Sequence, residues 1–214
     1  MLVPQIPVAK EGYPFIGFAA FCTLLLALLD FPVAAGIVFV LSIFVIGFFR
    51  DPERLGPERT DALVSPADGK IIVIEKSSDP HFTETDAVKI SIFMNVFNVH
   101  VNRIPCSGEV NRVIYKPGKF YSADSAKGAL ENEYCAVVIT ADNGQKLAFV
   151  QIAGLIARRI VCWLESGDKV SRGKRFGLIR FGSRVDLYLP EETEIAVKVG
   201  EKVRAGESVL GYLR

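Results

Sequence analysis

Two copies of one glycine-bounded pattern decide the fold: GDKVSRGKRFG at residues 167–177 and GEKVRAGESVLG at residues 200–211. Each copy starts with Gly, a charged residue, Lys and Val, continues to a second Gly, and closes with an apolar residue followed by Gly. Because glycine tolerates the backbone conformations of tight turns, each copy predicts a turn, a short strand and a second turn. The duplication predicts paired β-hammerheads that close a sandwich, and we assign it a purely structural role.

The segment before the two copies consists of short β-type runs separated by turn residues. The runs are Lys70–Glu75, Val88–Phe93, Val110–Tyr115, Tyr134–Thr140 and Lys146–Ile152. Clusters such as Pro66-Ala67-Asp68-Gly69 and Asp142-Asn143-Gly144 separate them. This spacing favours a mostly β fold, an antiparallel β sandwich with duplicated hammerhead-like C-terminal elements, over a βαβ arrangement. We place this β-rich domain at residues 51–214.

The N-terminal fifty residues differ sharply from the rest of the chain. The chain has 25 Lys and Arg and 24 Asp and Glu residues, and only four of these charges precede residue 51. Two apolar runs, Tyr13–Leu29 and Phe31–Phe49, are each close to the shortest helix that crosses a bilayer. Asp30 and Pro32 interrupt them with a charge and a helix breaker. Residues 1–50 are therefore predicted to form a transmembrane helical hairpin.

The residues that flank the hairpin indicate whether it is a cleaved signal peptide and how it is oriented in the membrane. A signal peptide would have a shorter apolar region followed by small residues, whereas Phe48-Phe49-Arg50-Asp51-Pro52 follows here. A hairpin returns the chain to its starting side, so Lys10, Arg50 and Arg54 share that side. The positive-inside rule predicts that this side, with the β-rich domain, is cytoplasmic.

Composition excludes two classes of binding function. The net charge is +1 and the pI is about 7.6, which gives no broad basic face for nucleic acid. The four cysteines are widely scattered, without a Cys-x-x-Cys pair or a histidine at metal-ligand spacing. We therefore expect neither a nucleic-acid partner nor a metal site.

A set of ordered motifs carries the chemistry. Gly182 and Ser183 lie within the strand-like segment Arg180–Asp186. On their own they would indicate a bulge in a strand. The other motifs are Phe49-Arg50-Asp51-Pro52, Ser65-Pro66-Ala67-Asp68-Gly69-Lys70 and Phe97-Asn98-Val99-His100-Val101-Asn102-Arg103. Together and in this order they resemble the phosphatidylserine decarboxylase family, from residue 48 to the C-terminus.

The resemblance implies a membrane-bound proenzyme that cuts itself between Gly182 and Ser183. Fragments 1–182 and 183–214 would then form a heterodimer in the cell membrane. In the family scheme the Ser183 hydroxyl attacks the Gly182 carbonyl, and elimination followed by hydrolysis leaves a pyruvoyl group at residue 183 as covalent cofactor and Schiff-base site. This group is the electron sink that decarboxylation needs, and the implied activity is conversion of a serine-headed membrane phospholipid to the ethanolamine-headed one.

The resemblance also points to the residues that activate Ser183. A serine hydroxyl needs a base, and an imidazole oriented by a carboxylate supplies one in unrelated serine enzymes. His100 and Asp68 are the candidates. Two positions depart from the commoner family pattern: Arg184 replaces a small hydroxyl residue, and Arg103 stands where longer relatives have a second histidine. The division of proton-transfer roles is therefore left open, as is the choice between a diacyl and an archaeal ether lipid.

Two other functions are compatible with parts of the sequence. A biotinyl- or lipoyl-type carrier module would also use paired hammerheads, but it needs a modifiable lysine at a tip between them. Lys198 is the only lysine in the segment 184–200, and no obvious turn presents it. A serine hydrolase could use Ser183 without self-cleavage, but the chain has no Gly-x-Ser-x-Gly elbow.

Overall fold

The computed structural model describes residues 7–77, 82, 86–123, 125, 128, 131–155, 159–180 and 183–213. The chain consists of two compact units, Met1–Glu53 and Arg54–Arg214. The division falls three residues after the boundary expected from the sequence. Each unit is described by itself.

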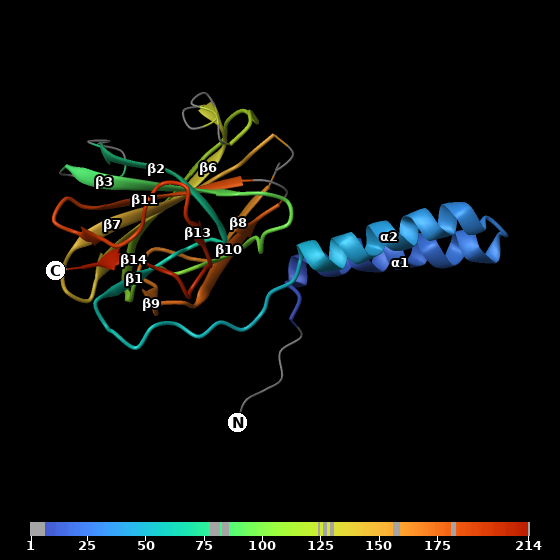
Figure 1. Ribbon diagram of the computed structural model, residues 1–214, viewed down its shortest axis with the longest axis horizontal. Helices are drawn as coiled ribbons and strands as arrows, with labels where there is room; N and C mark the ends of the chain where they lie inside the picture. Colours follow the sequence, from blue (N-terminus) through green and yellow to red (C-terminus); the bar gives the residue numbers. More distant parts are fainter. Residues whose placement is uncertain are drawn as a thin grey trace. The chain divides into compact units, whose positions relative to one another are not determined.

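The first unit is a helical hairpin (Figure 1). A 3-10 turn, η1 (Lys10–Gly12), leads into α1 (Tyr13–Leu28), and α2 (Pro32–Phe48) follows. Asp30 adopts a left-handed φ of 57° in the turn between them, where the sequence predicts the break. Together η1 and α1 form a segment that is long and apolar enough to cross a membrane by length and composition, whereas α2 is shorter.

Backbone and ring contacts close the open end of the hairpin. Val8 and Arg50 form an antiparallel bridge, and the Ala9 N–H donates to the Phe49 carbonyl at 2.8 Å. The rings of Phe15 and Phe49 stack with centroids 5.5 Å apart. The segments before α1 and after α2 therefore lie side by side, so the chain enters and leaves the hairpin at the same end.

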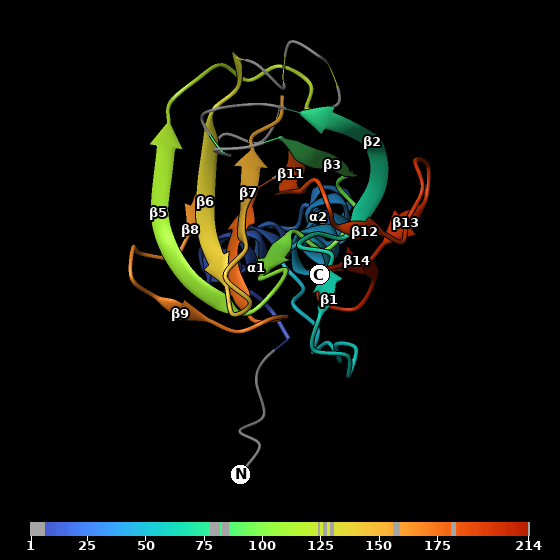
Figure 2. The ribbon, with the colours of Figure 1, turned by 90° about the vertical axis from the view of Figure 1, so that its left-hand side faces the viewer.

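The second unit is built almost entirely from antiparallel strands (Figures 1 and 2). The strands are β1 (Ala62–Val64), β2 (Gly69–Ser77), β3 (Ala87–Met94), β4 (Val101–Arg103), β5 (Gly108–Lys116), β6 (Tyr134–Ala141), β7 (Lys146–Ile152), β8 (Ile160–Cys162), β9 (Lys169–Val170), β10 (Arg175–Ile179), β11 (Ser183–Pro190), β12 (Glu194–Ile195), β13 (Lys202–Val203) and β14 (Val209–Tyr212). All five β-type runs predicted from the sequence are strands. The predicted mostly β, antiparallel fold is confirmed.

These strands form one large sheet and two small ones. The eight-stranded sheet has the order β13-β2-β3-β11-β7-β6-β5-β9, and the small sheets have the orders β1-β14-β12 and β4-β10-β8. Figure 2 shows β5, β6 and β7 side by side, with β2 and β3 beyond β11. Every pairing between the described strands is antiparallel.

The duplication extends over the whole unit. Strands β4 to β10 correspond, in chain order, to β1, β2, β3, β11, β12, β13 and β14. The two sets of seven strands are paired in the same way. We call residues 101–179 the inserted half, and residues 62–94 with 183–212 the outer half. The inserted half lies in the chain between β3 and β11, and one pairing, β11 with β7, joins the two halves in the large sheet.

The glycine pattern marks equivalent turns in the two halves. Gly167, Gly173, Gly200 and Gly206 all have φ between 75° and 94°, a range that side chains disfavour. The Gly167 N–H donates to the Val110 carbonyl, and the Gly200 N–H donates in the same way to Ile71. The duplicated hammerheads are therefore real, and they are one part of a larger repeat.

The core lies against one face of the large sheet, which we call the inner face. It includes buried side chains of both halves, such as Ile92, Phe149, Phe176, Val185 and Leu210. Phe149 and Phe176 meet edge to face with centroids 4.8 Å apart. A second cluster around Val150 and Tyr188 covers the outer face. The central strands β7 and β11 are thus buried on both faces, which explains the nearly continuous apolar sequence of β7, Leu147 to Ile152 with Gln151 as its single polar residue.

Removal of residues 1–49 is expected to leave a folded β unit with weakened membrane attachment, because the strands and their core all lie beyond residue 53. The measurements are far-UV circular dichroism with thermal melting, and sedimentation with membranes. A shortened chain that sediments with membranes as completely as the full chain would show that the hairpin is not the anchor.

A chain that starts at residue 55 provides a control. It lacks Arg54, whose guanidinium forms a buried ion pair with Asp68, with Nη2 and Oδ2 3.0 Å apart. Because loss of one partner leaves a buried charge uncompensated, we expect this chain to be about 3 kcal/mol less stable than one that starts at residue 50.

Candidate active site

Ser183 opens β11 at the point where the chain returns from the inserted half to the outer half. It lies opposite Met94, the last residue of β3, and its side chain is fully buried. The Ser183 Oγ donates to the Met94 Sδ at 3.4 Å. A thioether is a weak acceptor, so this contact orients the hydroxyl without strongly engaging it. Gly182, the other half of the predicted cleavage site, lies outside the described residues.

His100 stands at the other crossover, where the chain passes from β3 into β4. It is 2 % exposed, and its carbonyl accepts the Ile179 N–H at 3.3 Å, so its backbone is tied to the end of β10. Its Nδ1 lies 3.0 Å from the Asn98 carbonyl oxygen. A carbonyl can only accept, so in the neutral ring the proton sits on Nδ1 and Nε2 is left as the basic atom.

Asp68 lies in the predicted turn before β2 and is 8 % exposed. Its carboxylate accepts hydrogen bonds from the Arg54 guanidinium at 3.0 Å and from the Ala205 N–H at 2.8 Å. Arg54 also pairs with Glu207 at 3.0 Å. A bond from this carboxylate to His100 is not among its contacts with the described residues. That the two act as one unit therefore stays a prediction.

A buried amide pair lies beside Ser183 and was missed in the sequence. Asn102 and Gln151 are both fully buried, and the Gln151 Nε2 donates to the Asn102 Oδ1 at 2.9 Å. The Asn102 Nδ2 lies 3.8 Å from the same Met94 sulfur that Ser183 contacts. Within the described part of the chain the Gln151 Oε1 has no hydrogen-bond partner. The sign of this pair in the sequence is Gln151, the single polar residue in the apolar run 147–152.

The two arginines that depart from the family pattern have different surroundings. Arg184 is 3 % exposed and points to the outer face, where its Nη2 donates to Asp186 and Ser91, both at 2.8 Å. Arg103 is 4 % exposed, and its Nη1 donates to the Gly173 carbonyl at 2.8 Å. Arg184 is thus held in an ion pair on the face opposite to the side chain of Ser183.

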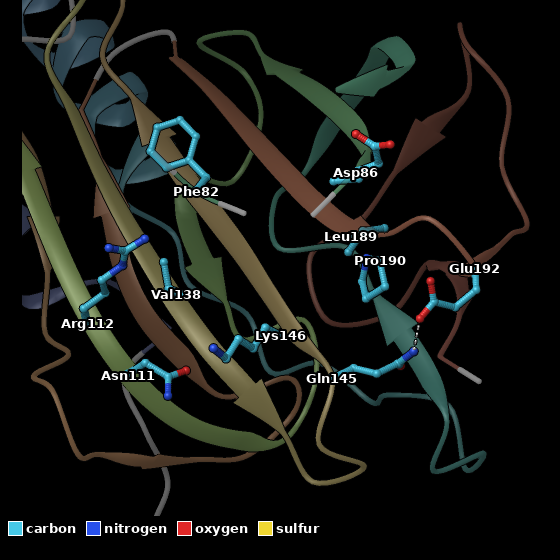
Figure 3. Close-up of a pocket in the computed structure, with 11 residues that line it drawn as sticks. Phe82, Asp86, Asn111, Arg112, Val138, Gln145, Lys146, Leu189, Pro190 and Glu192 are labelled. Carbon is cyan, nitrogen blue, oxygen red and sulfur yellow. Dashed lines mark hydrogen bonds between the residues drawn. The ribbon is translucent and has the colours of Figure 1, made fainter. Parts of the chain in front are cut away.

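Two cavities lie at opposite ends of the large sheet. One, of about 390 Å³, is bordered by Asp68 and by Asn95 and Asn98 of the crossover before His100. The other, of about 350 Å³, includes Leu189 and Pro190 at the far end of β11 (Figure 3). In Figure 3 the Gln145 amide donates to Glu192 at 3.1 Å across its rim. Six residues of strand span about 20 Å, so the second cavity is remote from Ser183, whereas the lining of the first includes Phe93, the chain neighbour of Met94.

Comparison with known proteins links this arrangement to an enzyme family. A family model described as phosphatidylserine decarboxylase matches residues 41–211. The chain is similar to a phosphatidylserine decarboxylase proenzyme of Desulfotalea psychrophila, with 62 % identity over 213 residues and all of both chains covered. It is similar to proteins of the same description from Citrifermentans bemidjiense, 52 % identical, and Geotalea uraniireducens, 49 % identical, each with 97 % of both chains covered.

Arg184→Ala is expected to destabilise the fold by about 3–5 kcal/mol, because it leaves the Asp186 carboxylate buried without its cation. For a chain of this size the melting temperature should fall by roughly 10 °C. The measurement is a thermal melt of the full chain in detergent, in a Ser183→Ala background. The double change Arg184→Met with Asp186→Leu removes both charges and should cost less. An equal loss in both variants would contradict this account.

Proposed function

The chain belongs to the phosphatidylserine decarboxylase family, and on this premise we propose that it converts a serine-headed phospholipid into the ethanolamine-headed phospholipid and carbon dioxide. The active form would arise by self-cleavage between Gly182 and Ser183, with fragments 1–182 and 183–214 remaining paired. The observation that carries the proposal is the position of Ser183, a fully buried hydroxyl at the junction of the two halves. Family membership favours this activity over a carrier module or a simple hydrolase.

The proposed cleavage begins with attack of the Ser183 Oγ on the Gly182 carbonyl carbon. The peptide C–N bond breaks, the nitrogen takes up a proton, and an ester replaces the amide. Loss of the Ser183 α-proton then expels the Gly182 carboxylate, and water hydrolyses the resulting dehydroalanine to the pyruvoyl group and ammonia. The His100 Nε2 is the proposed base for the hydroxyl proton, because the Asn98 carbonyl holds the ring proton on Nδ1.

Asp68 belongs to the same proposed set. Two donors, Arg54 and the Ala205 N–H, fix its carboxylate in place. We propose that its negative charge stabilises the imidazolium formed when His100 takes the proton. The ion pair with Arg54 reduces this effect, so the contribution of Asp68 should be smaller than that of His100.

The surroundings of residue 183 fit a pyruvoyl group. Such a group supplies an electron sink for the carbanion that decarboxylation leaves on the α-carbon. Ser183 is fully buried, and the amide pair beside it offers the Asn102 Nδ2 as a donor and the Gln151 Oε1 as an acceptor. The carbonyl oxygen of a pyruvoyl group needs a hydrogen-bond donor, and the amino group of a serine headgroup needs an acceptor. His100 is also proposed to deliver the proton to the α-carbon after carbon dioxide has left.

The N-terminal hairpin is proposed to hold the enzyme in the cell membrane. One segment, Lys10–Leu28, has the length and composition of a membrane span. Lys10, Arg50 and Arg54 flank the hairpin, and the positive-inside rule then puts the β unit in the cytoplasm. A tethered domain meets a lipid substrate at the membrane surface.

Intact-mass measurement of the purified protein tests the processing. We expect fragments 1–182 and 183–214, the second of 32 residues with a blocked, pyruvoyl N-terminus. The Ser183→Ala variant lacks the nucleophile and should remain one chain. Detection of full-length wild-type chain alone, with serine intact at position 183, would exclude both the cleavage and the cofactor.

His100→Ala is expected to slow cleavage by roughly 100- to 10,000-fold, the usual contribution of a general base. Asp68→Asn should also impair cleavage, and the double variant should be little worse than His100→Ala, because members of one unit are non-additive. Gel separation of the fragments over time gives the rates, and His81→Ala, which changes the other of the two histidines in the sequence, is the control. Normal cleavage by Asp68→Asn alone would limit Asp68 to its ion pair with Arg54.

A further inference from the structure

Two cysteine side chains meet where a small sheet packs against the large one. Cys135 lies on β6 in the large sheet and Cys162 on β8 in the sheet β4-β10-β8, and β6 contacts β8 (Figure 2). Cys135 belongs to the apolar core, and Cys162 is half-buried and packs against that core. Both thiols are free, and a hydrogen bond joins them. Two sulfurs in such contact need only a short movement to form a disulfide.

The surroundings make the two thiols unequal. The Cys135 thiol donates to the Cys162 sulfur, and this bond raises the pKa of Cys135 and lowers the pKa of Cys162. The Leu164 N–H also donates to the Cys162 sulfur and lowers the pKa of Cys162, whereas burial and the charge of Asp168 act in the opposite direction. The thiolate is the nucleophilic form of cysteine, so Cys162 is the reactive thiol and Cys135 is its partner.

The other two cysteines have different surroundings. Burial raises the pKa of the Cys106 thiol to about 12, and Cys22 lies in the apolar helix α1. An acidic thiol that solvent can reach, beside a second cysteine, is the arrangement found in redox-sensing proteins. Cys162 with Cys135 has this arrangement, and Cys106 provides a comparison within the same unit.

The thiol pair adjoins the amide pair of the proposed reaction centre. Cys135 on β6 is directly opposite Gln151 on β7, so their side chains share the inner face of the large sheet. The Gln151 Nε2 donates to the carbonyl of Val161, the residue before Cys162, at 3.4 Å. The same nitrogen donates to the Asn102 Oδ1 at 2.9 Å. A movement of β8 would therefore reach the amide pair through Gln151.

We propose that Cys162 and Cys135 are a modification site at which a peroxide forms a reversible disulfide. The Cys162 thiolate attacks one peroxide oxygen, the O–O bond breaks, and the departing hydroxide takes up a proton to give water. Cys162 is then a sulfenic acid. The Cys135 sulfur attacks the Cys162 sulfur, and its proton leaves with the hydroxyl group as a second water. Two electrons pass from the thiols to the peroxide, and a dithiol reductant reverses the change.

The disulfide would draw β8 toward β6 and so lower the activity. Because the Val161 carbonyl accepts from Gln151, this movement displaces the amide pair, and decarboxylation slows. The effect on activity rests on the proposed function, whereas formation of the disulfide does not. The proposed cytoplasmic location is reducing, and protein disulfides there are mostly transient and often redox-sensing. The enzyme would thus be less active under oxidising conditions and recover when they end.

Peptide mapping by mass spectrometry tests the bond itself, on the full-length Ser183→Ala chain in detergent treated with hydrogen peroxide. We expect a disulfide between Cys135 and Cys162, and a fall in free thiols from four to two. In a Cys135→Ser background dimedone should trap Cys162 as its sulfenic acid, whereas Cys106→Ser should still form the disulfide. Four intact thiols after treatment, or oxidation of Cys162 no faster than that of Cys106, would overturn the proposal.

Activity of the wild-type chain on soluble dihexanoyl phosphatidylserine tests the effect on the site. Diamide is the oxidant here, because peroxide also attacks keto groups. We expect kcat to fall by about 10- to 100-fold and to return with dithiothreitol, since a displacement of about 1 Å near a reaction centre can have such an effect. Cys162→Ser, the control, should keep its rate in diamide. An unchanged kcat in a chain that contains the disulfide would overturn the link to the site. A reduced chain without activity would instead contradict the proposed function, and mapping would still decide the disulfide.

Discussion

The pairing of β11 with β7 is the constraint on which the rest of the structure depends. It joins the two halves into one eight-stranded sheet, and it does so at the centre, where both strands are buried on both faces. A sheet face without a partner layer would expose its apolar side chains, so neither half can bury its core without the other. Because the inserted half lies in the chain between β3 and β11, two crossovers must lie at one end of this seam.

Those two crossovers place Ser183 and His100 at the same end of the seam. Ser183 follows one of them, and Met94 and His100 stand at the two ends of the other. In the inserted half, the equivalent connection between β6 and β7 is a tight turn at Asp142–Gly144. The two halves thus have equivalent strand connections. The connection from β3 to β11, which contains the inserted half, is the one beside which a buried serine, a histidine and an amide pair lie. Within the described residues the Gln151 Oε1 has no hydrogen-bond partner there, and a buried acceptor in that state costs about 1–3 kcal/mol.

The sequence predicts local features well and long-range pairing poorly. Alternating apolar residues locate the strands, and the glycine turns at 167 and 200 reveal the hammerheads, because both signals depend on neighbouring residues. The full repeat is not visible, since its other members are apolar strands of little sequence identity, separated by different spacings. For the same reason the sequence indicates Asp68 but not its ion pair with Arg54, fourteen residues away. The Asn102–Gln151 contact joins two sheets and depends on the folded structure alone.

The architecture also bears on what a cut after residue 182 would do to stability. The downstream fragment would contain β11, β12, β13 and β14, and the upstream fragment their partners β3, β7, β2 and β1. β11 is hydrogen-bonded along both edges and buried on both faces, so separating the fragments would expose the centre of the core. The cost of separation would therefore resemble that of unfolding the unit, whereas the cut itself removes one connection at the end of the sheet. A serine placed at the first residue of a central strand can thus lose its peptide bond while its own strand keeps it in the site.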